Sequence, residues 1–224
     1  MSDPVVSIGG AEAMTGVGVG RIPPLLGDAH GRYRIHLVGN SGTSKTTTGE
    51  ALAALLGVPF IALDELFYDP GWVLRPNEVF RANLRAALDA DPRGWVVDGN
   101  YTQMGGNTAF EEATDIIWLD PPLYVYFPRV VLRTFLRFFR LAPPSSPGCH
   151  ESPMQVFFSR NSIFWWCIWD HWRRREENGE RMALVGIGSG SDVARRRMRR
   201  FGGWGGDVKA WLAEVADMLR SRKD

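Results

Sequence analysis

The stretch GNSGTSKTTTGE, residues 39–50, decides how the rest of the chain is interpreted. It follows the Walker A pattern Gly-x-x-x-x-Gly-Lys-Thr of a phosphate-binding loop, from Gly39 to Lys45 and Thr46. The second glycine of the pattern is replaced by Ser44. The sequence around the loop must therefore decide between a working nucleotide site, a damaged one and an ordinary turn.

The surroundings of the loop favour a nucleotide site. RIHLV (34–38) is a short apolar run typical of a buried strand, and KTTTGEALAALLG (45–57) repeats apolar residues at helical spacing up to a glycine. A strand, glycine-rich turn and helix bring several backbone N–H groups to one point, where the helix end adds roughly half a positive charge. We predict that phosphates contact Gly39, Asn40, Ser41, Gly42, Thr43, Ser44, Lys45, Thr46 and Thr47.

Replacing glycine by Ser44 has one of two consequences, depending on whether the position requires a positive φ or close approach of a phosphate. If the position needs a positive φ, serine costs about 1–2 kcal/mol. If it needs only close approach of a phosphate, the hydroxymethyl group either crowds that phosphate or donates a hydrogen bond to it. Each charge-assisted hydrogen bond to phosphate contributes roughly 1.5–3 kcal/mol. We therefore expect Ser44 to weaken nucleotide binding and not to abolish it.

The composition is that of an ordinary globular protein, with 45% hydrophobic and 23% charged residues. A net charge of +1 creates no field that would recruit nucleic acid or an anionic membrane. Two cysteines are too few for a disulfide framework, which favours a reducing, cytoplasmic setting. No window of about 18 residues lacks a charge, so we expect no membrane span.

Apolar runs alternate with helical patterns after a glycine-rich start. Residues 1–31 carry no secretion signal and are expected to be a flexible extension before a domain at 32–224. Alternating strands and helices predict an α/β fold, with a five-stranded parallel sheet and helices on both faces. The expected strands are 34–38, 58–64, 94–101, 114–122 and, more weakly, 181–188; further helices are expected over 76–90 and 207–221.

The chain resembles the adenylate-kinase-like P-loop kinases, and among them the DNA topology modulation (FlaR-like) proteins. The matching segments are LVGNSGTSKTTTGEALAALLGVP, LDELFYDPGW, WVVDGNY, IIWLDPP and SRNSIFWWCIWDHWRRR, between about Arg34 and Arg175. The resemblance implies a P-loop fold that binds ATP and Mg²⁺ and transfers a phosphoryl group to a small acceptor. Ser44 departs from the usual loop of these proteins, which concerns catalytic rate more than fold.

Three aspartates follow the expected strands, at the sheet edge where such folds bind ligands. By resemblance, Asp64 orients the acceptor hydroxyl or acts as its base, although a helix or turn cap is the alternative. Asp98 resembles the acid that holds Mg²⁺ together with Thr46, with an ordinary Asp-Gly turn as the alternative. We expect Asp120 to cap the helix that begins at the prolines. Asn100, Tyr101, Phe67, Tyr68 and Trp72 are candidates to line the acceptor pocket, and Arg75 to clamp an anionic group.

The segment RVVLRTFLRFFR (129–140) places arginines at steps of four, four and three, on one face of a helix. Like charges at this spacing repel unless anions or acids lie between them. We expect a helical lid over about 123–178, with PPSSPG (143–148) at its tip; solvated surface arginines are the alternative. By resemblance Arg129 and Arg133 are the catalytic pair. Arg137, Arg140, Arg160, Arg173, Arg174 and Arg175 complete the cation excess.

Two remaining features add no chemistry. The basic run ARRRMRR (194–200) is expected to be a flexible surface insertion. His36, His150 and His171 show no metal-ligand spacing with the cysteines, so we expect no zinc site.

The sequence thus predicts a cytoplasmic ATP-dependent kinase acting on an unidentified small molecule or nucleotide, as a monomer or weak dimer. Lys45, Asp64, Arg129 and Arg133 are its expected catalytic residues, and Thr46 and Asp98 its metal ligands. One alternative is a nucleotide-binding regulator or slow NTPase, in which Ser44 reduces turnover. A second is a nucleic-acid-associated protein that uses the arginine-rich lid, against which the balanced charge argues.

Overall fold

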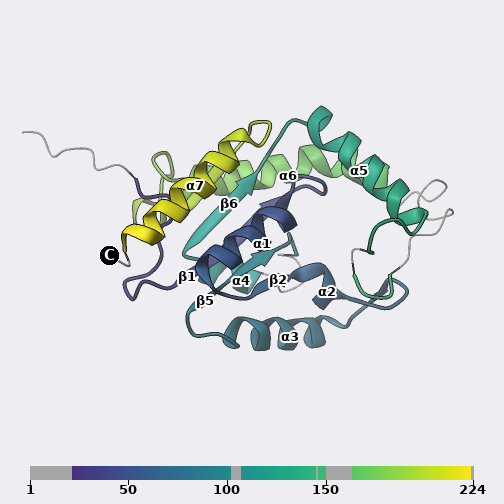
Figure 1. Cartoon of the computed structure of the whole chain (residues 1–224), viewed down its shortest axis with the longest axis horizontal. Helices are drawn as coiled ribbons and strands as arrows, with labels where there is room; N and C mark the ends of the chain where they lie inside the picture. The colour runs from purple at the N-terminus through teal and green to yellow at the C-terminus, as the bar shows by residue number, and fades with distance from the viewer. Residues whose placement is uncertain (1–21, 102–106, 145, 150–162, 223–224) are drawn as a thin grey trace, which may run out of the picture.

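The computed structural model describes residues 22–101, 107–144, 146–149 and 163–222. Its central element is a parallel sheet of five strands in the order β2-β5-β1-β6-β7, so the strand that enters the loop lies in the middle (Figure 1). This confirms the predicted α/β fold of the P-loop kinase type. The strands are β1 (Tyr33–Gly39), β2 (Phe60–Ala62), β5 (Gly94–Asp98), β6 (Asp115–Leu119) and β7 (Met198–Phe201).

Helices cover both faces of the sheet because side chains of a buried strand point alternately to each side. Ile35 and Leu37 of β1 face a core that includes residues of α1 (Lys45–Leu56) and α7 (Gly206–Ser221). Val38 faces the opposite core. That second core includes residues of α2 (Leu63–Phe67), α3 (Asn77–Asp89), α4 (Asn107–Glu112) and α6 (Ile163–Val185).

The fifth strand is not where the sequence placed it. Residues 181–185 continue α6, and of the predicted strand 181–188 only Gly186 forms a bridge, with Met198. The edge strand β7 comes from the basic run instead, which is therefore not a flexible insertion. An edge strand tolerates arginines because their guanidiniums can reach acceptors at the sheet margin. Arg197 donates to the carbonyls of Glu111 and Ala113, and Arg200 to Asp120.

Residues 22–31, which the sequence analysis placed in the extension, contact the folded core. Leu25 is fully buried, and the N–H groups of Leu26 and Gly27 donate to the Asp115 carboxylate at 2.8 and 3.0 Å. The Trp211 indole donates to the Pro24 carbonyl. Residues 1–21 lie outside the described part of the chain.

Two helices form the expected lid region. α5 (Leu123–Phe138) packs against α6, and both lie beside the end of the sheet where β1 enters the loop (Figure 1). Residues 146–149 contact the hairpin formed by β3 (Tyr68–Asp69) and β4 (Val73–Leu74): Gly71 N–H donates to the Gly148 carbonyl, and Cys149 Sγ lies 3.4 Å from the Asp69 carbonyl. The segment that we predicted to be the tip of a lid thus contacts the β3–β4 hairpin. The 3₁₀ turn η3 (Val193–Arg195) precedes β7.

Among the described helices, none combines the length and the apolar character needed to cross a membrane.

Candidate active site

Two glycines let the loop pack tightly against β6 and α5. Gly39 has φ 147°, and a Cβ at this position would lie 2.3 Å from the Leu119 carbonyl oxygen. Gly42 has φ 80°, and its Cβ would lie 2.4 Å from Val130 of α5. Because side chains are excluded at both points, the backbone approaches β6 and α5 closely.

Ser44 takes the left-handed conformation, with φ 70° and ψ 24°. Of the two requirements weighed from the sequence, the position therefore imposes positive φ, at a cost of about 1–2 kcal/mol for serine. Ser44 directly precedes α1, yet its hydroxyl makes no capping hydrogen bond to that helix. The side chain therefore contributes nothing to the start of α1, and its contact lies elsewhere.

Lys45 and Thr46 of α1 meet Asp98 at the end of β5. The Thr46 hydroxyl donates to Asp98 Oδ2 at 2.8 Å, and Lys45 Nζ lies 3.9 Å from Asp98 Oδ1. Lys45 Nζ also donates to the Asn40 carbonyl at 2.9 Å. Burial raises the pKa of the Asp98 carboxyl, although Lys45 and Thr46 oppose the shift. A carboxylate and a hydroxyl side by side are the hard oxygen donors that Mg²⁺ prefers.

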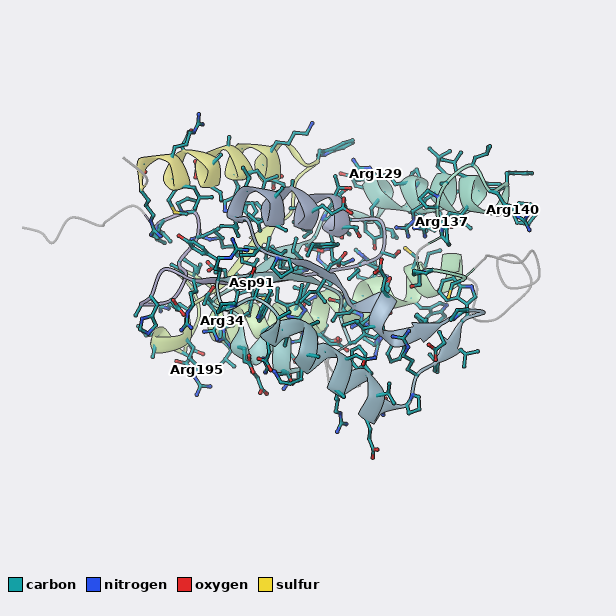
Figure 2. The ribbon with its side chains drawn as sticks, turned by 60° about the horizontal axis from the view of Figure 1, so that its bottom comes forward. Arg34, Asp91, Arg129, Arg137, Arg140 and Arg195 are labelled. Atoms are coloured by element: carbon teal, nitrogen blue, oxygen red, sulfur yellow. The ribbon has the colours of Figure 1, made fainter. Side chains whose placement is uncertain are left out.

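Two arginines of α5 reach over the loop. Arg133 Nη2 donates to Ser41 Oγ at 2.6 Å, and Arg129 Nη1 lies 3.4 Å from Ser44 Oγ. The structure thus brings together the loop and the two arginines that the sequence singled out. Figure 2 shows Arg129 and Arg137 on α5 and Arg140 just beyond its end, far from Arg34 and Arg195.

Hydrogen bonds that the sequence analysis missed fix the start of the loop. Asn100, expected in the acceptor pocket, instead donates to the Gly39 carbonyl at 2.5 Å and accepts from Gly39 N–H at 3.3 Å. The buried Asn40 accepts from Ser41 N–H and donates to the Tyr126 hydroxyl at 2.9 Å. The Asn-Tyr dipeptide after Asp98 hinted at Asn100; Tyr126 carries no comparable signal.

Tyr126 links the loop to α6. Because its oxygen accepts from Asn40, its O–H is available to donate to His171 Nδ1, 2.8 Å away. That geometry requires a neutral imidazole, and burial indeed lowers the pKa of His171. A second buried histidine, His36 of β1, contacts the Gly99 carbonyl through Nε2 at 2.7 Å, and burial lowers its pKa to about 4.

Asp64 lies in the first turn of α2 and not at the end of a strand, since β2 stops at Ala62. It is exposed, and Oδ1 accepts from the Tyr101 hydroxyl at 2.6 Å. Burial and the nearby Asp64 raise the pKa of Tyr101, which keeps it a donor. Asp64 also lies close enough to Asp98 to raise its pKa. The Tyr101 ring packs 4.5 Å from that of Phe67.

Of the two remaining threonines predicted to contact phosphate, Thr43 is buried in the loop and Thr47 is exposed. Thr43 Oγ1 donates to the Asn40 carbonyl at 2.8 Å and tightens the turn. Thr47 is exposed in the first turn of α1.

One expectation about a charged residue is wrong, that for Asp120, and the expected clamp Arg75 has protein partners of its own. Arg75 donates to Asp69 at 2.7 Å and to the carbonyls of Glu65 and Leu66, so it braces the β3–β4 hairpin. Asp120 does not cap α5, whose N-cap is Pro122 without a side-chain hydrogen bond. It pairs with Arg200 at 2.5 Å and Arg175 at 3.2 Å instead. In both cases a nearby opposite charge competes with the predicted role.

The lid arginines of α6 are paired with an acid. Arg173 and Arg174 donate to Asp170 at 2.6 and 2.7 Å, and Arg174 also donates to the Asn100 carbonyl at 3.0 Å. Arg174 therefore supports the loop indirectly. Arg160 lies outside the described residues.

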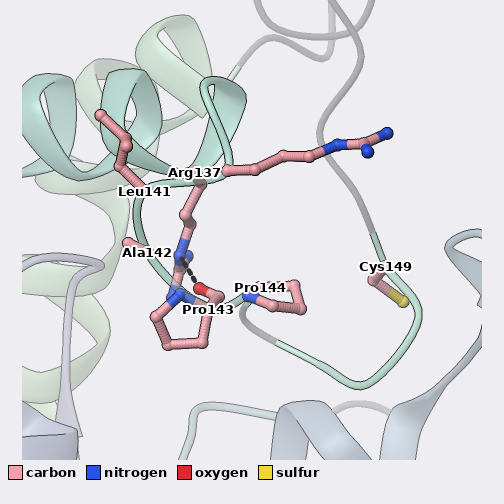
Figure 3. Close-up of a pocket in the computed structure, with 7 residues that line it drawn as sticks. Arg137, Leu141, Ala142, Pro143, Pro144 and Cys149 are labelled. Carbon is pink, nitrogen blue, oxygen red and sulfur yellow. Dashed lines mark hydrogen bonds between the residues drawn. The ribbon is translucent and has the colours of Figure 1, made fainter.

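A pocket of about 340 Å³ lies at the far end of α5, away from this site (Figure 3). Arg137 crosses it and donates to the Pro143 carbonyl at 3.0 Å. No residue predicted to bind phosphate lines it. Its other lining residues are Arg140, Leu141, Ala142, Pro144 and Cys149.

Fold and loop together define an α/β protein with a P-loop-like turn between β1 and α1. No protein-family model matches the chain, and no curated protein matches it, so the resemblance to FlaR-like proteins stays a prediction. Among solved structures, shikimate kinase from Bacteroides thetaiotaomicron is 19% identical over 84% of this chain and 97% of its own, with a TM-score of 0.46.

Two further solved structures show the same degree of likeness. Shikimate kinase from Acinetobacter baumannii, in complex with shikimate, is 17% identical over 86% of this chain and 95% of its own, with a TM-score of 0.47. Gluconokinase from Sinorhizobium meliloti 1021 is 18% identical over 86% and 97%, with a TM-score of 0.43. Likeness this distant assigns no substrate, so the chemistry must come from this chain's own residues.

Proposed function

We propose that this protein is an ATP-dependent phosphotransferase that acts on a small molecule or nucleotide. One observation carries the proposal: cations and oxygen donors from three separate elements converge on a single glycine-rich loop. Lys45 and Thr46 come from α1, Asp98 from β5, and Arg129 and Arg133 from α5. Phosphoryl transfer needs this combination, because catalysis consists of positioning and of neutralising charge on the phosphate oxygens.

Each group has a part in holding the nucleotide. Backbone N–H groups of residues 39–47 would cradle the phosphates at the positive end of α1. The Lys45 ammonium now donates to the Asn40 carbonyl, a neutral acceptor that a phosphate oxygen would replace. Arg129 and Arg133 supply positive charge from the opposite side, where it stabilises the transferring group.

Thr46 and Asp98 would hold Mg²⁺. Their oxygens lie 2.8 Å apart, and Asp98 is buried with its pKa raised. A divalent cation there would favour the ionised carboxylate and offset the cost of burying it. Bound Mg²⁺ would neutralise negative charge on the phosphates.

Asp64 would orient the acceptor hydroxyl. It is exposed beside the loop, and Tyr101 fixes one of its oxygens through a 2.6 Å hydrogen bond. The other oxygen accepts no hydrogen bond from the described residues and could accept from a substrate hydroxyl, as a positioning group or general base does.

The left-handed Ser44 favours a second candidate, a nucleotide-binding regulator or slow NTPase. Strain at this point would reduce turnover more than binding if the phosphate-contacting N–H groups were slightly misplaced. Comparing formation of ADP from Mg·ATP with and without candidate acceptors separates the two functions, because a kinase passes the phosphoryl group to the acceptor and an NTPase passes it to water. Stimulation by an acceptor identifies a kinase, and a rate indifferent to every acceptor identifies an NTPase.

The nucleotide site itself is tested by Lys45→Ala. Wild-type protein should melt at a higher temperature in millimolar Mg·ATP. A ligand at 100 times its Kd raises the free energy of unfolding by about 2.7 kcal/mol. Lys45→Ala should lose most of this shift, while Lys209→Ala, on the exposed surface of α7, should keep it. A wild-type protein whose melting temperature ignores Mg·ATP would contradict the proposal.

A further inference from the structure

The loop and α5 meet through two hydroxyl–guanidinium pairs. Ser41 and Ser44 are three residues apart in the loop, and Arg133 and Arg129 are four residues apart, one turn, on the helix. Ser41 Oγ accepts from Arg133 at 2.6 Å, and Ser44 Oγ lies 3.4 Å from Arg129 Nη1. Residues four apart lie on the same face of a helix. The two serines therefore contact one face of α5, through its two arginines.

Ser44 stands where the backbone favours glycine. At φ 70° a glycine would be unstrained, and the serine side chain gives α1 no capping hydrogen bond in exchange. What the hydroxyl contacts is the Arg129 guanidinium. The Ser44 side chain therefore interacts with Arg129 and not with α1, the helix that it precedes.

We propose that Ser41 and Ser44 are positioning residues that hold Arg133 and Arg129 over the mouth of the loop; this rests on the proposed phosphotransferase function. A hydroxyl is neutral, so it fixes the guanidinium without cancelling its charge. Each guanidinium has five N–H donors in a planar fork, and one bond to serine leaves the others for phosphate oxygens. A carboxylate in the same place would compete with the phosphate.

The buried environment of Arg133 supports this role. Its Nε atom is buried and has no hydrogen-bond partner among the described residues, so its bond to Ser41 is a main constraint on its orientation. A guanidinium with a buried unsatisfied donor is poised for an additional acceptor. A phosphate oxygen is the acceptor that the loop would bring there.

A double-mutant cycle tests the proposal, with formation of ADP from Mg·ATP as the readout. Ser44→Ala should lower kcat by about tenfold with KM for ATP nearly unchanged, because the arginine acts mainly in the transition state. In an Arg129→Ala background the same change should cost nothing more. Ser44→Asn should recover much of kcat, since asparagine tolerates the left-handed conformation and its amide oxygen can accept from Arg129.

Ser44→Gly separates positioning from folding. It removes both the strain and the hydroxyl, so it should melt at a higher temperature than wild type and still lose about tenfold in kcat. Ser41→Ala paired with Arg133→Ala should give the same non-additive pattern.

Equal costs in the wild-type and Arg129→Ala backgrounds, or a fully active Ser44→Gly protein, would overturn the positioning role. The proposed function fails separately, and first, if wild-type protein forms no ADP and shows no melting shift with Mg·ATP; the inference then falls with it.

Discussion

The arginines of α5 and those of α6 differ in their partners. Arg129 and Arg133 contact the neutral hydroxyls of Ser44 and Ser41. Arg173 and Arg174, by contrast, share the buried carboxylate of Asp170. A carboxylate cancels the charge of a guanidinium, whereas a hydroxyl leaves it in place. An arginine-rich segment therefore indicates a phosphate site only where its partners are neutral.

Asp98→Asn should have the largest effect on turnover. It tests whether the carboxylate of Asp98 is needed to hold Mg²⁺ in the site. Asp98 is a carboxylate near the α5 arginines, and removing it should cut Mg²⁺-dependent turnover by about 10–100-fold. A magnesium titration of ADP formation measures the loss. Turnover equal to that of wild type at every Mg²⁺ concentration would remove Asp98 from the site.

The same change should raise the stability of the nucleotide-free protein. In the unfolded chain Asp98 ionises near the ordinary pKa of 3.8, but burial raises its pKa in the folded protein. Stability therefore falls as pH rises above 3.8 and stays reduced above the folded pKa, a loss that asparagine avoids. Asp91→Asn is the control, because hydrogen bonds from Arg93 lower the pKa of Asp91 to about 2; it should not raise the melting temperature.

Arg133→Ala should have the next largest effect. The variant loses a charge that forms no ion pair among the described residues, so kcat should fall by about tenfold or more, with a smaller change in the Kd for ATP. Arg173→Ala is the matched control: its partner is Asp170, and kcat should stay within about twofold of wild type. An equal loss of kcat in both variants would show that the α5 and α6 arginines do not differ in their contribution to turnover.

Asp170→Asn should have the smallest effect, and on stability instead of turnover. It weakens three charge-assisted hydrogen bonds that Arg173 and Arg174 donate to a buried carboxylate, which costs roughly 1–3 kcal/mol. For a chain of this size, thermal unfolding should begin about 2–4 °C lower per kcal/mol. Arg195→Ala, at an exposed guanidinium, should change stability by less than about 0.5 kcal/mol. An unchanged melting temperature in Asp170→Asn would show that the charge of Asp170, paired with Arg173 and Arg174, does not contribute to stability.

The sequence predicted those parts of the molecule that local patterns determine. Apolar runs before Gly39, Asp98 and Asp120 identified β1, β5 and β6, and the spacing of arginines identified α5. The fifth strand was missed because Met198 is its one buried residue, and arginines at a sheet edge look like a surface run. Periodicity carries no signal for a strand of this kind.

The contacts within the site depend on tertiary folding and could not be predicted. Asn40 and Tyr126 are 86 positions apart in sequence, and Arg133 and Ser41 are 92 apart. Each pairing exists because α5 crosses the loop, and no local pattern encodes that crossing. The motif correctly located the loop, yet it did not indicate Asn100 as the residue that holds Gly39.

The short segment ahead of β1 sets a practical limit for anyone shortening this protein. Asp115 begins β6 fully buried, and its carboxylate accepts the N–H groups of Leu26 and Gly27. Trimming the chain to residue 32, where the sequence pattern suggests that the domain begins, would strip those donors from a buried acid and uncover the site that Leu25 fills. A shortened form of this protein should therefore keep Pro24, Leu25, Leu26 and Gly27, which lie before the first strand that a motif search would recognise.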